Sequence, residues 1–138
     1  MPVTGLEAIC DGIMRQEGWY PGSRSNRNRN PGNLRRSPYT ATQDADGYDV
    51  FDSLVQGYSA LTYDVRAKVT GHSEHGLTAS STLDDLFDVY APRSDKNDPN
   101  SYAAAVAQWC TQALGRPCTH NTTLRALCVE LFPQGGSA

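Results

Sequence analysis

Apolar residues recur at helical spacing in short segments that are closed by glycine or proline, and this pattern restricts the fold more than any other feature of the chain. The first such segment covers residues 5–17, where apolar side chains return every three or four positions. The pattern therefore predicts about five helices in all. The later four run from Leu54 toward Gly71, from Leu83 to Tyr90, from Asp98 to Gly115 and from Leu124 to Leu131.

Capping residues indicate where these helices begin and end. Thr4 and Glu7 form a Thr-x-x-Glu capping box, in which each side chain bonds the backbone N–H of the other residue. Gly18 is a natural stop for the first helix, so Glu17 is predicted to be its last residue. Equivalent start signals open the next three helices, at Ser53 with Gln56, Thr82 with Asp85, and Asp98 with Pro99.

The stretch between the first two helices lacks helical periodicity. Residues 19–34 are rich in Arg, Asn, Ser, Gly and Pro, which predicts a long loop. Pieces with high β-propensity at 34–40 and 48–51 flank the turn signal Asp46-Gly47, which predicts a small irregular hairpin. No linker separates two apolar cores, so we expect one α+β, mostly helical domain over residues 1–138, with a flexible tail from about residue 133.

The composition argues against several classes of protein. With 138 residues and 38% apolar content, the chain can build one modest core. A formal net charge of −3 and a pI near 5.5 argue against a protein that coats DNA or RNA, although five arginines lie between Arg24 and Arg36. No apolar run approaches the roughly 20 residues that span a bilayer, and no signal peptide is evident, so we expect a soluble protein or an excised domain.

The cysteines and histidines do not form a metal-binding pattern. The four cysteines, at positions 10, 110, 118 and 128, form no CxxC pair. Their even number permits two disulfides in three alternative pairings, and they are equally compatible with four small buried apolar side chains. His72, Glu74 and His75 lie in a polar loop without a convincing third ligand. We therefore expect no metal and no cofactor.

Glu17 is the strongest candidate for a catalytic residue. It follows Ile13 by four residues and Leu6 by eleven, so helical geometry puts its carboxyl on the apolar stripe. Desolvation there and the negative end of the helix dipole both disfavour the charged form, so we expect Glu17 to hold its proton near neutral pH. Cleavage of a glycosidic bond requires such an acid, because the leaving oxygen must receive a proton. Alternatively, Glu17 only hydrogen-bonds a loop or pairs with a following arginine.

Several segments occur together in an order that resembles a known family. They are QEGW at 16–19, NRNPGNLR at 28–35, YDVFDSLVQGYSAL at 48–61, and YAP followed by ND and SYAAAVA. This combination resembles phage and prophage lysozyme-like proteins of the lytic transglycosylase type, over roughly residues 6–110. The resemblance implies a lysozyme-like fold in which the catalytic glutamate ends the first long helix and is followed by Gly or Ser. Glu17 and Gly18 match that pattern.

The resemblance also implies a role for the asparagine and glycine run in the loop. Asn30-Pro31-Gly32-Asn33 would bring the chain back past the glutamate into the hairpin that walls the sugar cleft. Asn30, Gly32, Asn33 and Arg35 are therefore expected to bind saccharide. The alternative is a turn that only braces the loop.

Three further residues receive expected roles from the same resemblance. Tyr90 precedes Ala91-Pro92 at a helix end, where related enzymes place a tyrosine hydroxyl that orients the catalytic carboxyl. The alternative for Tyr90 is a core aromatic on the third helix. Asn97 and Tyr102 lie in the next matching segment and are expected to line the cleft.

The implied activity is cleavage of the MurNAc–GlcNAc β-1,4 bond of peptidoglycan, with Glu17 as acid and base and a 1,6-anhydro product. One alternative is a hydrolytic muramidase, which would take a second carboxylate from Asp44, Asp46, Asp49 or Asp52. Another is a virion protein that binds the cell wall without cutting it. We expect a monomer that acts at the bacterial cell wall, in the periplasm or outside the cell. It would be phage-encoded or secreted, and its arginines would face this anionic polymer instead of nucleic acid.

Overall fold

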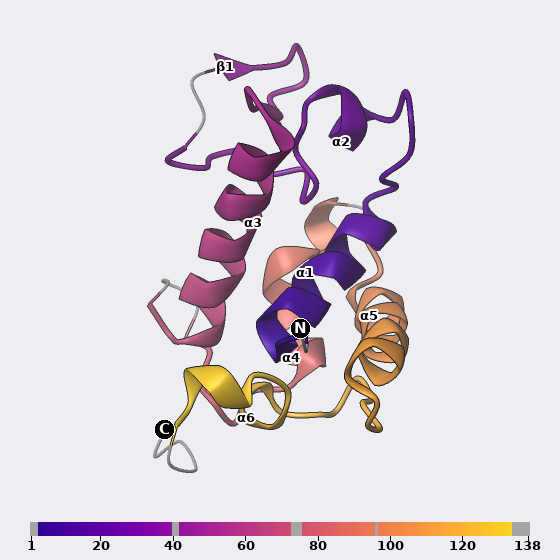
Figure 1. Ribbon diagram of the computed structural model, residues 1–138, viewed down its shortest axis with the longest axis vertical. Helices are drawn as coiled ribbons and strands as arrows, with labels where there is room; N and C mark the ends of the chain where they lie inside the picture. Colours follow the sequence, from indigo (N-terminus) through magenta and orange to yellow (C-terminus); the bar gives the residue numbers. More distant parts are fainter. Residues whose placement is uncertain (1–2, 40–41, 73–75, 96, 134–138) are drawn as a thin grey trace.

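The computed structural model describes residues 3–39, 42–72, 76–95 and 97–133, and it consists mostly of helices around one core (Figure 1). None of the described helices is both long and apolar enough to cross a membrane. The α-helices are α1 Gly5–Gln16, α2 Arg24–Arg27, α3 Leu54–Val69, α4 Leu83–Tyr90, α5 Pro99–Leu114 and α6 Leu124–Leu127. The 3-10 turns are η1 Arg93–Asp95 and η2 Val129–Leu131, and the strands are β1 Thr42–Gln43 and β2 Asp49–Val50.

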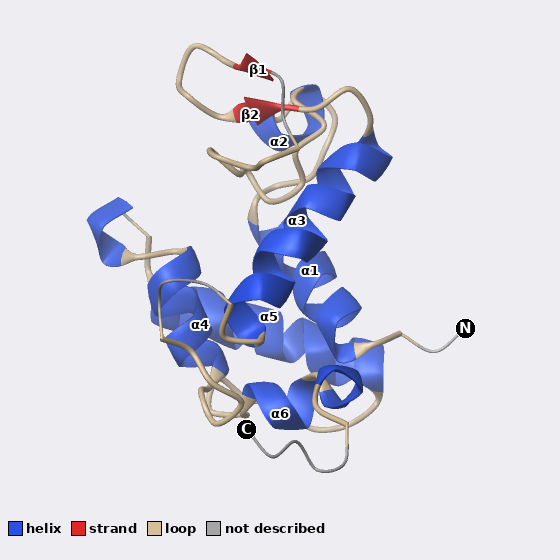
Figure 2. Ribbon diagram, turned by 90° about the vertical axis from the view of Figure 1, so that its left-hand side faces the viewer, coloured by secondary structure: helices blue, strands red, loops and turns tan. Residues whose placement is uncertain are grey.

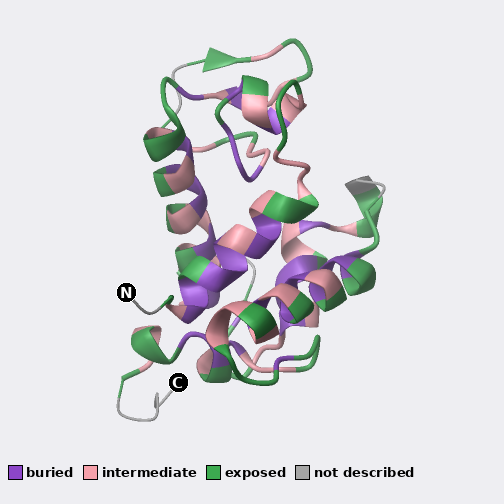
Figure 3. Cartoon of the chain, turned by 45° about the vertical axis from the view of Figure 1, so that its right-hand side comes forward, coloured by how far each residue is buried: buried purple, intermediate pink, exposed green. Residues whose placement is uncertain are grey.

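Helix α1 forms the centre of the core. It packs against α5 and α3, while α4 packs against α5. Ile9 and Ile13 on α1 are fully buried, as are Leu61 on α3 and Val106 on α5. Burial of each such side chain stabilises the fold by about 1.5–3 kcal/mol. Buried residues gather where these helices meet, and exposed ones cover their outer faces (Figure 3).

A glycine on α3 allows the long loop to lie directly on that helix. A Cβ built at Gly57 would be 1.9 Å from the carbonyl oxygen of Arg29 and 3.1 Å from the Pro31 ring. No other residue type fits this approach without moving the backbone. Gly57 therefore sets the position of the loop segment that leads into the site.

The loop and the hairpin form a separate layer above the helices (Figure 2). The two strands pair antiparallel, with Thr42 opposite Val50 and Gln43 opposite Asp49. Asn28 ties the loop to this hairpin, because its Nδ2 donates to Asp44 Oδ2 at 2.8 Å and its carbonyl accepts from Phe51 N at 2.9 Å. Each strand has only two residues, so the sheet is small. Side-chain hydrogen bonds such as that of Asn28 to Asp44 therefore help to hold the loop and the hairpin together.

The prediction of a mostly helical α+β chain with a small hairpin is confirmed. Four local corrections apply: three concern helices, and the fourth concerns a strand. Helix α1 ends at Gln16, so Glu17 is its C-cap and not its last residue. The loop predicted at 19–34 contains α2, one turn whose N-cap is Ser23. The last predicted helix divides at Cys128 into α6 and η2. The predicted tail falls largely on residues 134–138, which lie outside the described residues.

The fourth correction concerns the first strand, which was predicted at 34–40 and lies at 42–43 instead. The Ser37 N–H donates to the side chain of Asp49 at 2.7 Å, where a strand would offer a carbonyl. Pro38, which has no N–H to donate, follows it. Among the described residues 34–39, only Leu34 forms a backbone hydrogen bond to the second strand, by accepting from Asp49 N at 2.8 Å.

All four cysteines are buried and carry free thiols, so they act as small core side chains. Burial is the main cause that raises the pKa of Cys10 to about 12, and it raises the pKa of Cys110 to about 12 as well. A thiol with so high a pKa is protonated and unreactive near neutral pH. The disulfide alternative therefore finds no support in this structure.

Candidate active site

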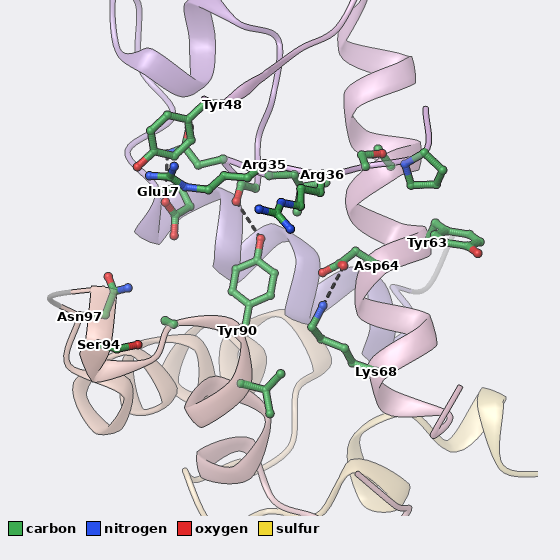
Figure 4. A pocket seen from close by; sticks show the side chains of 18 residues that line it. Glu17, Arg35, Arg36, Tyr48, Tyr63, Asp64, Lys68, Tyr90, Ser94 and Asn97 are labelled. Carbon is green, nitrogen blue, oxygen red and sulfur yellow. Dashed lines mark hydrogen bonds and ion pairs between the residues drawn. The ribbon is translucent and has the colours of Figure 1, made fainter. Parts of the chain in front are cut away.

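A cleft of about 600 Å³ lies between the loop layer, α3, α4 and the segment that follows α4 (Figure 4). Glu17 lines it at the end of α1, together with residues 32–38 of the loop and Tyr48 of the hairpin. Helix α3 contributes Asp64 and Lys68 to the opposite wall. Five separate parts of the chain thus converge on one concave site. This is the kind of pocket in which enzymes hold small substrates.

The backbone at the end of α1 aims the Glu17 side chain into this cleft. The Glu17 N–H still bonds the Ile13 carbonyl at 2.8 Å, so the residue remains attached to the helix. Gly18 then adopts a φ of 75°, which turns the chain away at once. Glu17 itself is half-buried. A rigid helix end therefore carries a carboxyl that reaches the cleft.

Two hydrogen-bond donors hold the Glu17 carboxyl. Asn33 Nδ2 donates to Oε1 at 2.9 Å, and the Tyr102 hydroxyl donates to Oε2 at 2.7 Å. These donors come from the loop and from α5, so each oxygen is fixed by a different part of the molecule. Hydrogen bonds to an ionised carboxylate are stronger than those between neutral groups. The pair therefore fixes the orientation of the carboxyl.

Tyr102 is suited to donate this hydrogen bond. It is only 8% exposed, and its ring stacks on Phe87 with centroids 4.7 Å apart. Burial raises the pKa of the Tyr102 phenol well above its usual value, and the nearby charge of Glu17 raises it further. The hydroxyl is therefore protonated at any pH near neutral. Tyr102 was predicted to line the cleft, and it lies behind the glutamate instead.

Asn33 reaches Glu17 because of an unusual backbone conformation. Its φ is 48°, in the left-handed region that asparagine tolerates better than most residues. Its N–H bonds the Asn30 carbonyl at 3.0 Å, which closes the turn. Positive φ values at residues other than glycine are often found at functional sites. Asn33 lines the cleft, and the saccharide binding that the resemblance implies for it stays a prediction.

Asn30 was predicted to bind saccharide, and the structure corrects this. The residue is fully buried, and its Nδ2 donates to the carbonyls of Leu34 and Asp49 at 2.9 Å each. Its Oδ1 accepts from Leu34 N at 2.9 Å. The whole amide is thus used to brace the turn, and none of it faces the cleft.

Tyr90 and Gly32 lie together on the cleft wall, and both were predicted as site residues. The Tyr90 hydroxyl donates to the Gly32 carbonyl at 2.8 Å, a contact drawn in Figure 4. A Cβ on residue 32 would lie 2.6 Å from that hydroxyl, so the Tyr90 side chain would have to shift for any residue other than glycine. The tyrosine that binds the catalytic candidate is therefore Tyr102, while Tyr90 anchors the loop to α4.

Positive charge lies along the cleft. The Arg35 guanidinium stacks 4.1 Å above the Tyr48 ring, and Arg36 also lines the cavity. On α3, Lys68 forms a 2.7 Å ion pair with Asp64. Arg35 was predicted as a site residue, whereas the contribution of α3 was missed. An Asp and a Lys four positions apart are typical of an ordinary helix surface, so only the packing of α3 identifies them.

Asn97 lies at the far rim of the cleft, as expected from the sequence. It is exposed and stands beside Ser94, on the segment that follows α4 (Figure 4). It lies on the opposite side from the hairpin. Asn97 is therefore free to contact a ligand, in contrast to Asn30.

The four aspartates proposed as a second carboxylate lie outside the residues that line the cleft. Asp49 is fully buried and accepts from Ser37 and Gln43. Asp44 closes the hairpin turn, and the hydrogen bond from Asn28 is the main cause that lowers its pKa. The other two are Asp46, which is ion-paired with Arg24, and Asp52, which is exposed.

The cleft thus offers one carboxyl fixed by two donors, and a lysine-paired Asp64 on the far wall. The described residues contain no group of three or more His, Cys, Asp or Glu side chains arranged to hold a metal ion, and Glu74 and His75 lie outside them. Proton transfer by Glu17 is the chemistry that these groups can perform. Comparisons of the chain with protein-family models, with curated proteins and with solved structures give no match.

Proposed function

We propose that this chain is a lysozyme-like enzyme that cleaves the MurNAc–GlcNAc β-1,4 bond of peptidoglycan as a lytic transglycosylase, with Glu17 as acid and base. The observation that carries the proposal is the Glu17 carboxyl at the wall of a cleft of about 600 Å³, held by Asn33 and Tyr102. The resemblance of the segments around Glu17 and Asn33 to that family supports the same function.

The reaction uses one carboxyl twice. Protonated Glu17 gives its proton to the glycosidic oxygen while the bond from that oxygen to the anomeric carbon of MurNAc breaks. The resulting carboxylate then takes the proton of the MurNAc 6-hydroxyl as that oxygen bonds the anomeric carbon. The product is a 1,6-anhydro ring, and Glu17 regains its proton. Asn33 and Tyr102 stabilise the carboxylate between the two steps.

The surroundings of Glu17 favour a transglycosylase over a hydrolytic muramidase. A hydrolase normally needs a second carboxylate near the scissile bond. None of the hairpin aspartates lines the cleft, and Asp64 is bound to Lys68. A mechanism with a single carboxyl fits these contacts better.

The charge of the cleft supports peptidoglycan as the substrate. MurNAc carries a lactyl group and a peptide with carboxylates, whereas chitin is uncharged. Arg35 and Arg36 line the same cleft as Glu17, so an anionic glycan is attracted to it. The enzyme would act as a monomer at the bacterial cell wall.

Digestion of purified peptidoglycan tests the proposal. Fragments released by the protein are separated and weighed by mass spectrometry. We expect 1,6-anhydro ends, which weigh one water less than reducing ends. Reducing ends would indicate the muramidase instead, and binding without any release would indicate a wall-binding protein that lacks turnover.

A further inference from the structure

A second, smaller hollow of about 290 Å³ lies between α3 and the loop at Tyr39, beside the cleft. Tyr63 lines both cavities, so the hollow and the cleft adjoin at this residue. Figure 4 shows the Tyr63 ring on α3, directed away from Glu17. The residues that line the hollow are Tyr39, Tyr58, Ser59, Thr62, Tyr63 and Arg66.

Two exposed tyrosine rings line this hollow. Tyr39, from the loop, and Tyr63, from α3, are 46% and 51% exposed. Their rings meet edge to face, with centroids 5.5 Å apart and planes at 86°. This contact holds each ring in place and leaves much of both rings accessible to solvent. Large aromatic side chains exposed beside a cavity commonly mark a binding site.

We propose that Tyr39 and Tyr63 form an outer saccharide site, which holds sugar rings of the glycan strand beyond those in the catalytic cleft. The inference rests on the proposed function for the identity of the polymer. A pyranose ring has an apolar face that packs on an aromatic ring, and its hydroxyls need polar partners. Ser59 and Thr62 supply hydroxyls beside the tyrosines, and Arg66 supplies a cation for a MurNAc carboxylate.

The size and the position of the hollow favour a glycan over a protein partner. A stable protein interface buries about 800 Å² and takes about 20 residues on each side, whereas six residues line this hollow. A polymer that occupies the cleft must leave it at its ends. Since Tyr63 belongs to both cavities and touches Tyr39, a strand that leaves the cleft at Tyr63 can reach Tyr39.

The test measures binding without turnover, in a Glu17→Gln background. Isothermal titration calorimetry uses two probes, alternating GlcNAc–MurNAc oligosaccharides of four and of eight rings. Tyr39→Ala is the informative variant, because Tyr39 lines the outer hollow and does not line the cleft. We expect it to weaken binding of the eight-ring probe about three- to tenfold and to leave the four-ring probe unchanged.

Two control variants sharpen this test. Tyr39→Phe keeps the ring and should bind like the parent. Tyr20→Ala removes a tyrosine that is 57% exposed and lines neither cavity, and it should have no effect. Equal affinity of Tyr39→Ala and the parent for the eight-ring probe, an equal loss for both probes, or no binding of either probe would overturn the inference.

The binding test and the activity test can fail separately. If the length-dependent loss is found while the wild-type protein releases no fragments from peptidoglycan, the outer site stands and the proposed enzyme is wrong. If fragments are released but Tyr39→Ala binds both probes normally, the enzyme stands and the outer site is wrong.

Discussion

The hydroxyl of Tyr102 donates a 2.7 Å hydrogen bond to Oε2 of Glu17, which joins two side chains that lie 85 residues apart in the chain. The bond links the middle of the core to the wall of the cleft, because Tyr102 is buried on α5 and stacked on Phe87. The position of the carboxyl therefore depends on how α5 packs against α1 and α4.

Replacement of Tyr102 by phenylalanine should impair turnover more than folding. The ring and its stacking remain, but the donor to Glu17 is lost. A hydrogen bond to a charged group contributes about 1.5–3 kcal/mol, so we expect kcat on peptidoglycan to fall about 10- to 100-fold. Tyr90→Phe is the control, because it loses only the bond to the Gly32 carbonyl. A normal kcat for Tyr102→Phe would contradict the role given to this hydroxyl.

Two variants of Asn33 should separate the side chain from the backbone. Asn33→Gly loses the donor to Glu17 but tolerates the φ of 48°, so kcat should fall about tenfold or more. Asn33→Ala loses the same donor and is strained at that φ as well. We expect equal activity for the two variants but a lower free energy of unfolding for Asn33→Ala, measured by urea denaturation. Full activity of either variant would remove Asn33 from the site.

Gly57→Ala should destabilise the protein, although alanine normally favours a helix. The new Cβ would meet the Arg29 carbonyl oxygen at 1.9 Å, and this overlap costs about 1–3 kcal/mol or more. The displaced loop carries Asn33, so activity should fall too. Val55→Ala, at a position of α3 that is 77% exposed, should change the free energy of unfolding by no more than about 0.5 kcal/mol. A Gly57→Ala variant as stable as wild type would contradict the loop contact.

Stability should decline at alkaline pH because of the buried thiols. Burial is the main cause that raises the pKa of Cys10 from 9.0 to about 12, so the unfolded chain loses this proton at a lower pH than the folded protein. The resulting stabilisation is complete below pH 9.0 and is lost as the pH rises toward about 12. Unfolding in reducing buffer at about pH 8 and about pH 11 measures the decline. Cys10→Ala should show a smaller decline, and an equal one would show that Cys10 does not contribute.

The helix boundaries could be predicted because capping is local. The reciprocal bonds of Thr4 with Glu7 and of Thr82 with Asp85 are present as expected, and α5 ends where Gly115 takes a φ of 69°. Each signal involves residues within one turn of each other. The hairpin was harder to predict, because side chains such as that of Asp49 replace strand partners there.

The candidate site could be predicted only in part. Glu17 was found from its position at a helix end and Asn33 from the resemblance, and the two side chains meet at the cleft. The choice between Tyr90 and Tyr102 as the partner of Glu17 depends on packing between helices, which periodicity does not encode. Nor does sequence distinguish Asn30 from Asn33, since two asparagines in one turn can face opposite ways.

The central claim is that Glu17 donates a proton to the glycosidic oxygen, and one variant tests this claim most directly. Glu17→Gln keeps the size of the side chain and its ability to bond Asn33, but it cannot give up a proton as an acid. We expect the rate of peptidoglycan cleavage to fall at least about 100-fold, while circular dichroism and binding to insoluble peptidoglycan remain as in wild type. Cleavage by Glu17→Gln at the wild-type rate would contradict the account.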